Sequence, residues 1–278
     1  MLPWIPRRGP ARSPRRPVHR RAVLGAAVAL AGSACSPGTP RARPGTTTAP
    51  GTPAGNRVLV FSRTAGFRHD SIPAGVQAIR RLGGQSGFGV DATEDAAAFT
   101  GANLDRYRAV VFLNTTGDVL DGAGQAAFQG YVRHGGGFVG VHAASDTEYG
   151  WPFYGGLVGA YFAAHPPIQR ATVRVEDRTH PATAHLGAAW TRVDEWYNFR
   201  TDPRSAVHVL ATVDESSYTG GTMGADHPIA WYAPYQGGRS FYTALGHTTA
   251  SYAEPAFLAH LLGGIGYAGG FATHTLGG

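Results

Sequence analysis

Residues 135–149 place the strongest constraint on the fold of this chain. They follow a helix-like segment, residues 122–134, and open with three glycines, which supply the left-handed backbone that often ends a helix. The short apolar run at residues 138–142 comes next, and such runs are typical of strands that helices cover on both faces. His142 therefore stands at the carboxyl end of a predicted strand, with Asp146 in the turn that follows. Ligands of open α/β sheets bind outside the carboxyl ends of the strands.

Strand-like and helix-like segments alternate before this stretch. Residues 57–62 predict a first buried strand, residues 88–92 and 109–114 predict a second and a third strand, and residues 72–82 predict a helix with Pro73 in its first turn. Together with the helix at 122–134 and the strand at 138–142, they form a β-α-β-α-β alternation. This order argues for a parallel sheet.

The composition of the sequence changes after residue 148, where a glycine-rich segment that ends at His165-Pro166-Pro167 contains many aromatic residues. Residues 171–176 and 207–214 alternate like strands. Residues 229–235 and 239–245 predict a hairpin, and residues 254–262 predict an amphipathic helix. No internal repeat or linker interrupts residues 57–268, which we therefore assign to one domain, with residues 269–278 as a C-terminal tail.

The basic charge of the chain is confined to its leader. Nine of the 24 arginines lie in residues 1–55, which hold no acidic residue, so 15 basic and 18 acidic residues remain beyond them. Nucleic acid is therefore not an expected partner, although a basic whole chain would normally suggest one. The chain contains no lysine, which excludes Schiff-base chemistry and a P-loop lysine.

Residues 1–35 resemble an export signal of the twin-arginine type. Arg20 and Arg21 precede an apolar run to Ala34 that is too short to span a bilayer. Cys35, the only cysteine, follows small residues as in a bacterial lipoprotein box, although Gly32 stands where such boxes usually carry leucine. We therefore expect an exported protein, either lipid-anchored at Cys35 or cleaved beside Ala34 and secreted. A lipid on Cys35 would be the only membrane contact. Residues 36–56, rich in Pro, Gly and Thr, predict a flexible linker.

Polar residues gather where predicted strands end. The candidates for catalysis are His142, Asp146, Glu195 and His247, and the candidates for substrate binding are Arg68, His69, Trp151, Trp196, Tyr197 and His227. Because the carboxyl ends of parallel strands share one edge of a sheet, these groups are expected to converge in an aromatic-walled cleft.

Several blocks of this sequence resemble the trehalose-utilisation, or ThuA-like, family. They are Gly-Phe-Arg-His-Asp-Ser-Ile at 66–72, the block at 135–146, Asp-Glu-Trp-Tyr-Asn-Phe at 194–199, Asp-His-Pro-Ile-Ala-Trp at 226–231 and the block at 239–247. The resemblance covers residues 57–268. It implies a three-layer, doubly wound, flavodoxin-like α/β fold of the class I glutamine amidotransferase type, with a mostly parallel sheet and an added β-hairpin region. It also implies a role in carbohydrate breakdown.

The segment that resembles the amidotransferase elbow departs from those enzymes at its centre. They place a nucleophilic cysteine on a sharp strand-to-helix turn, whereas this chain has His142 there and His247 where the partner histidine is expected. The only cysteine lies in the leader, so glutamine hydrolysis by a thiol is excluded.

Three hypotheses follow for the function. The first is an enzyme, such as a glycosidase, lyase or isomerase, whose aromatic residues cover a sugar ring while histidine and carboxylate groups transfer protons. The second adds a divalent metal such as zinc, held by ligands drawn from His69, His142, Asp146, His227 and His247. The third is an exported protein that binds a saccharide without chemistry.

Overall fold

A nine-stranded sheet forms the centre of the molecule in the computed structural model, which describes residues 55–273. Its strand order is β2-β1-β3-β4-β11-β10-β9-β6-β7. The strands are β1 (Arg57–Phe61), β2 (Gly89–Thr93), β3 (Ala109–Leu113), β4 (Gly137–Val141), β6 (Gln169–Val175), β7 (Ala189–Asp194), β9 (His208–Val213), β10 (Pro228–Tyr235) and β11 (Gly238–Thr243). A separate pair consists of β5 (Phe162–Ala164) and β8 (Asn198–Phe199).

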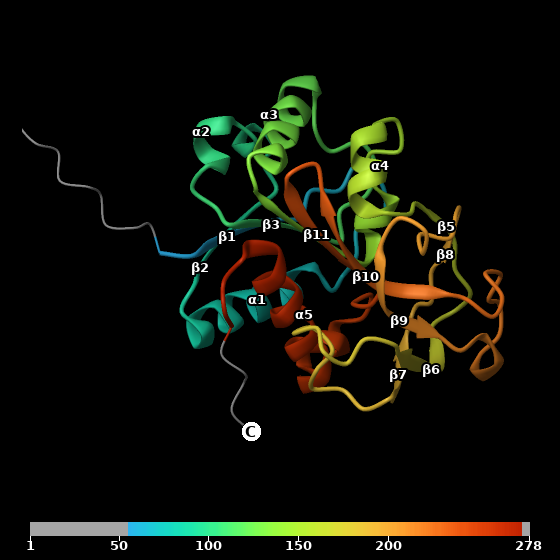
Figure 1. The fold of residues 1–278 in the computed structure, drawn as a ribbon. Coiled ribbons are helices and arrows are strands. Elements are labelled where there is room, and N and C mark those ends of the chain that lie inside the picture. Colours follow the sequence, from blue (N-terminus) through green and yellow to red (C-terminus); the bar gives the residue numbers. More distant parts are fainter. Residues whose placement is uncertain (1–54, 274–278) are drawn as a thin grey trace, which may run out of the picture. The chain divides into compact units, whose positions relative to one another are not determined.

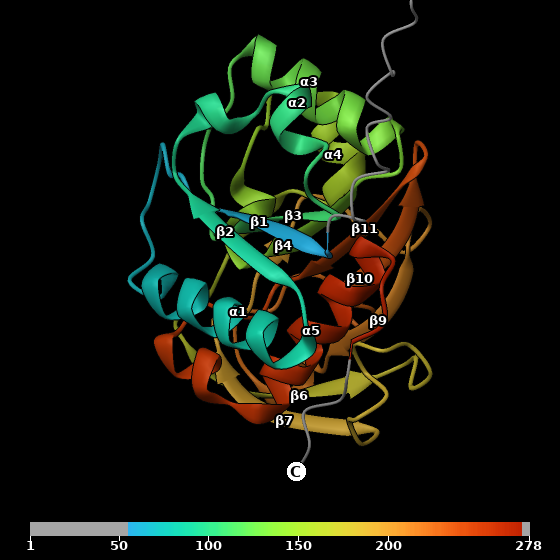
Figure 2. The same ribbon diagram turned by 90° about the vertical axis from the view of Figure 1, so that its left-hand side faces the viewer.

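Helices cover both faces of the sheet and make three layers. They are α1 (Ile72–Ser86), α2 (Gly101–Leu104), α3 (Gly122–Arg133), α4 (Pro152–Val158) and α5 (Pro255–Gly269). Figure 2 shows α2, α3 and α4 on one face and α1 and α5 on the other. None of the helices between residues 55 and 273 has both the length and the apolar character needed to cross a lipid bilayer.

The strands from β2 to β11 run parallel, which confirms the predicted α/β class (Figure 1). In the central strand β4, Val139 pairs with Val111 of β3 on one side and Phe241 of β11 on the other. The predicted hairpin is present, but its two strands belong to the main sheet, because β11 is the fifth parallel strand and β10 begins an antiparallel half.

Strand direction explains why the site lies at one edge of the sheet. Each pairing from β11 through β10, β9 and β6 to β7 is antiparallel, so β7 points the same way as β4 and β11. The carboxyl ends of β1, β4, β7 and β11 therefore share one edge. Main-chain bonds tie the loops there together: Ala65 N donates to Thr116 O (2.7 Å) and Gly117 N to Asp146 O (2.8 Å).

Two predicted helices differ from the structure in length. The first extends to Ser86, beyond the expected residue 82, and ends at Gly87 in the left-handed conformation (φ 76°). The last runs to Gly269 and is not amphipathic, because ten of its residues are buried. Residues 181–182 bury part of this helix, since they pack so closely against it that a Cβ on Gly263 would lie 2.4 Å from Pro181. The export signal, Cys35, the linker to residue 54 and the tail from residue 274 lie outside the described residues.

His260 of α5 makes the stability of the fold sensitive to acid. The ring is buried against Trp190, Phe241 and Phe257 and hydrogen bonds through Nδ1 to Ala182 O at 2.8 Å. Burial lowers the pKa of His260 to about 3. In the unfolded chain the same group takes up a proton below about pH 6.5.

We therefore expect the free energy of unfolding to fall as the pH drops from 6.5 toward 4, because the unfolded chain then binds the extra proton. The contribution of His260 is fully present above pH 6.5 and is lost at up to about 1.4 kcal/mol per pH unit. Denaturant unfolding at pH 7, 5.5 and 4.5 measures it. The variant His260→Gln should show a shallower pH dependence, and identical slopes in the two proteins would contradict the assignment.

Candidate functional site

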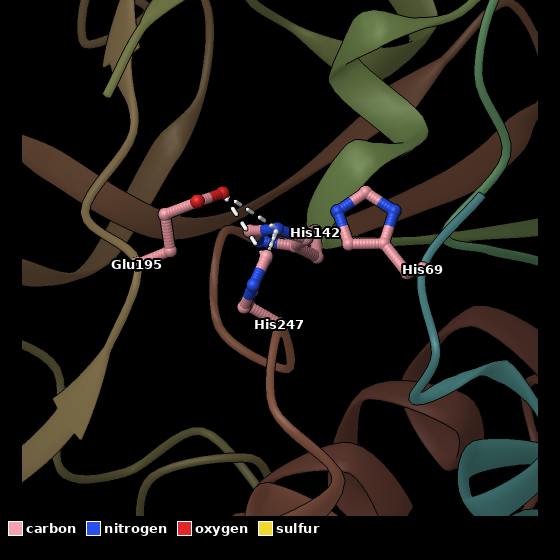
Figure 3. A group of neighbouring side chains, drawn as sticks. All are labelled: His69, His142, Glu195 and His247. Carbon is pink, nitrogen blue, oxygen red and sulfur yellow. Dashed lines mark hydrogen bonds and ion pairs between the residues drawn. The ribbon is translucent and has the colours of Figure 1, made fainter. Parts of the chain in front are cut away.

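Four side chains from distant parts of the sequence converge at the carboxyl edge of the sheet: His69, His142, Glu195 and His247 (Figure 3). They follow β1, β4, β7 and β11 respectively. Each offers a donor atom, and these atoms all lie within 4.8 Å of one another. We call these four residues the His/Glu cluster.

His142 lies at the centre of the cluster, on a sharp turn. Its backbone is left-handed (φ 50°), an uncommon conformation for a residue other than glycine, and a short 3₁₀ helix starts directly from β4 at this residue. The side chain is fully buried, and Nδ1 lies 2.7 Å from Ala244 O. Tyr197 packs against the ring, with 4.1 Å between ring centres.

Short polar contacts join the other members of the cluster. Nε2 of His142 lies 3.1 Å from Nδ1 of His247 and 3.4 Å from Oε2 of Glu195. Nδ1 of His247 lies 3.1 Å from the same carboxylate oxygen. His69 faces the group from the opposite side, and its ring contacts those of His142 and His247 edge-on, with 4.9 and 5.0 Å between centres (Figure 3).

Burial and neighbouring charge set the ionisation of the cluster. Burial lowers the pKa of His69 to about 3, helped by the nearby rings of His142 and His247. Burial alone would raise the pKa of Glu195, but hydrogen bonds from His142 and His247 outweigh it and hold this pKa below its usual range. Burial alone would lower the pKa of His247, but the hydrogen bond and charge of Glu195 raise it. At neutral pH the cluster therefore combines an ionised carboxylate with a neutral His69.

A cavity of about 320 Å³ opens over the cluster. Its lining residues are Phe67, His69, Asp146, Phe162, His165, Glu195, Tyr197 and His247. The volume is at the small end of the range for small-molecule sites, roughly 300–1,000 Å³. Aromatic rings and ionisable groups together give it the mixed character that such sites need to orient a ligand.

The structure brings together most of the catalytic candidates and only some of the binding candidates. His142, Glu195 and His247 meet in the cluster, and Asp146 lines the cavity, where its carboxylate accepts a hydrogen bond from the Tyr149 hydroxyl at 2.6 Å. Of the aromatic candidates, only Tyr197 reaches the cavity.

The remaining candidates lie elsewhere. Arg68 pairs with Glu94 (2.7 Å) beside a separate pocket, and Trp151 packs against neighbouring aromatic rings. Trp196 is buried and donates its indole N–H to Gln169 O at 2.8 Å. His227 is buried behind the site, where Nε2 lies 2.8 Å from Tyr197 O, and it therefore supports the backbone of the segment that carries Glu195.

Chain alternation explains these differences. Neighbouring side chains of an extended segment point to opposite sides. Glu195 and Tyr197 therefore line the cavity while Trp196 between them enters the core, and Phe67 and His69 line it while Arg68 points away.

Three lining residues were missed as site residues in the sequence: Phe67, Phe162 and His165. Phe67 lies in the block at 66–72, and its exposure of 66% marks it as a surface aromatic. Nδ1 of His165 reaches Oε1 of Glu195 at 3.0 Å. The alternation of Phe67 with His69 could have indicated Phe67 as a site residue. The positions of Phe162 and His165 depend instead on how β5 pairs with β8.

Asp194, next to Glu195, holds the His247 loop in place. The buried carboxylate accepts hydrogen bonds from Gly246 N (2.9 Å) and His247 N (3.1 Å), and Oδ2 also pairs with Arg192 at 2.9 Å. The end of β7 therefore fixes both the side chain of Glu195 and the backbone of His247.

Gly246 has no room for a side chain in this loop. Its φ is +105°, and a Cβ would lie 3.0 Å from both the Phe257 ring and the Tyr252 hydroxyl. We expect Gly246→Ala to lower the free energy of unfolding by about 2 kcal/mol and to displace His247. The control is Gly84→Ala, since this exposed position in α1 has open space around the new Cβ and alanine should stabilise the helix there. Denaturant unfolding of both variants tests this, and equal stability of the two would contradict it.

The comparisons with known proteins agree with this fold. The profile of the ThuA family, described as trehalose utilisation, matches residues 57–268. A ThuA-like protein from Bacteroides uniformis has 25% identity and a TM-score of 0.68, with 77% of this chain and 91% of that chain covered. A ThuA-like protein from Parabacteroides merdae has 22% identity and a TM-score of 0.66, with 80% of this chain and 92% of that chain covered.

A β-galactosidase from Bacillus circulans shares the fold alone, with 12% identity and a TM-score of 0.53 over 78% of this chain and 32% of that chain. None of the curated proteins matches the chain. The family match and the ThuA-like structures confirm the predicted flavodoxin-like, class I glutamine amidotransferase-like fold, and they support a carbohydrate-related role. The chain belongs to the ThuA family.

Proposed function

We propose that this chain is an exported enzyme that processes a saccharide, of the size of trehalose or a keto-sugar derived from such a disaccharide, in carbohydrate breakdown. The observation that carries the proposal is the cavity over the His/Glu cluster, which combines aromatic walls with ionised and neutral polar groups. The description of the family as trehalose utilisation supports the substrate class.

The cavity walls suit a sugar ring. Phe162 and Tyr197 pack together with 4.3 Å between ring centres, and Phe67 stands at the rim. Aromatic faces cover the C–H surface of a pyranose, while Asp146 and His165 are placed to bond its hydroxyl groups. At about 320 Å³ the cavity has room for about one sugar unit, so the second unit of a disaccharide would extend past Phe67 toward solvent.

The reacting bond would lie over Glu195 and His247, which face the cavity while His142 supports them from beneath. Ionised and neutral groups side by side are the arrangement that stabilises developing charge and moves protons in hydrolysis, elimination or isomerisation of a sugar. Export is proposed from the twin arginines of the leader, Arg20 and Arg21.

Turnover by the purified chain tests this function. The chain is incubated with trehalose, other disaccharides and their keto derivatives, and the products are identified by mass spectrometry, with His247→Gln purified in parallel to exclude contaminating glycosidases. We expect at least one saccharide to be consumed by the native chain and not by the variant. Saccharide binding without any product would point instead to a non-catalytic binding protein, and neither binding nor turnover would remove the carbohydrate assignment at this cavity.

A further inference from the structure

The donor atoms of the His/Glu cluster have the spacing of a metal coordination shell. The three distances among Nε2 of His142, Nδ1 of His247 and Oε2 of Glu195 are 3.1, 3.4 and 3.1 Å. Bonds of about 2.0–2.2 Å in a tetrahedral zinc site separate neighbouring ligand atoms by about 3.4 Å. The three atoms therefore already lie close to the corners of one face of such a tetrahedron.

The hydrogen bond at Nδ1 of His142 leaves the lone electron pair of the ring on Nε2, which faces the cluster. Nδ1 lies 2.7 Å from Ala244 O, and a carbonyl oxygen can only accept, so Nδ1 carries the proton and donates it. In the neutral ring Nε2 is then an electron-pair donor, and it points at Glu195 and His247. A ligand histidine in a metalloprotein is usually oriented in this way, by a hydrogen bond from its other nitrogen.

Contacts outside the cluster hold the other donors in place. His165 contacts Oε1 of Glu195 at 3.0 Å, which leaves Oε2 directed at the two histidines. Asp194 binds the backbone N–H of His247. His69 closes the group on the remaining side, with one ring nitrogen turned toward the other three residues (Figure 3). The cluster is therefore fixed before any ligand arrives, which lowers the entropy cost of binding.

We infer that His69, His142, Glu195 and His247 form a binding site for one divalent first-row transition metal ion, with zinc as the representative case. Three imidazoles and one carboxylate suit such ions better than magnesium or calcium, which prefer oxygen ligands. Since His69, Glu195 and His247 line the cavity, the ion would enter from there and face a bound saccharide. It would supply Lewis acidity toward a sugar oxygen or a bound water.

This inference deepens the proposed function, because it assigns the chemistry of the same site, but metal binding can be measured without any substrate. The full chain is purified without a polyhistidine tag, equilibrated with Zn²⁺ or Co²⁺ and dialysed, and its metal content is measured by elemental analysis. We expect one ion per chain. X-ray absorption of the unmodified zinc-loaded chain should show imidazole nitrogens in the first coordination shell, a measurement that needs no variant to fold.

Variants then locate the ion. Glu195→Gln and His247→Gln should each weaken binding at least about 100-fold, while His185→Gln should leave it unchanged, because His185 is exposed, hydrogen bonds to the Ala256 carbonyl and does not line the cavity. No stoichiometric ion, a shell without imidazole, or full binding by both cluster variants would overturn the inference. Metal binding without saccharide turnover would leave the inference standing and remove the proposed function. Saccharide turnover by a chain that binds no ion would support the proposed function and overturn the inference.

Discussion

Asp194→Asn is expected to lower the free energy of unfolding by about 3 kcal/mol, because the buried Arg192 then keeps only the partly exposed Glu254, at 3.4 Å, as an acidic partner. The two side chains form an ion pair at 2.9 Å and expose no more than 2% of their surface. Asp194 also accepts backbone hydrogen bonds from Glu195, Gly246 and His247, and an asparagine cannot satisfy all of these donors. At roughly 2–4 °C per kcal/mol for a domain of this size, the thermal midpoint should fall by about 10 °C.

The matched control is Glu94→Gln, which removes a carboxylate from an ion pair with Arg68 whose members are about half exposed. Exposed pairs of this kind contribute about 0–1 kcal/mol. The double variant Arg192→Gln, Asp194→Asn should regain part of the loss, since it removes both charges together. Equal destabilisation by Asp194→Asn and Glu94→Gln would show that the buried pair does not organise the site.

Glu195→Gln has the largest expected effect on function. It keeps the shape of the side chain but removes the negative charge that lies 3.1 Å from His247 and 3.4 Å from His142. We expect kcat/KM for the saccharide to fall at least about 100-fold, whether the carboxylate binds a metal or stabilises charge directly. Because the replacement is nearly isosteric, far-ultraviolet circular dichroism should be unchanged.

Steady-state kinetics on the native chain, Glu195→Gln and the control Glu176→Gln test this prediction. Glu176 forms an exposed ion pair with Arg204 at 2.9 Å and does not line the cavity, so its charge should matter little for turnover. Activity of Glu195→Gln within a factor of a few of the native chain would contradict the assigned role.

Much of the fold could be predicted because its apolar runs and glycines are local signals. The strands β1, β3 and β4 are short apolar segments, and Gly135 and Gly136 mark the end of α3. The strand β7 was missed for a physical reason. Its buried residues, Trp190, Arg192 and Asp194, include an ion pair, while alanine, threonine and valine face solvent, so the usual pattern of apolar residues inside is reversed.

The candidate site could be predicted as far as strand ends determine it. His142 and His247 each lie within a few residues of the end of a parallel strand, and such ends meet at one edge of the sheet, whereas Glu195 follows β7, which was not predicted. The aromatic lining could not be predicted as well, because it depends on which way each side chain points. Trp196 and Phe162 each stand beside a tyrosine in the sequence, yet the first is buried in the core and the second lines the cavity.

The most direct test of the proposed function is a crystal structure of the chain with trehalose or its keto derivative. We expect electron density for a sugar ring against Phe162 and Tyr197, with an oxygen atom over Glu195 and His247. A saccharide found only in the neighbouring pocket beside Arg68 and Arg80, or none bound at high concentration, would contradict it.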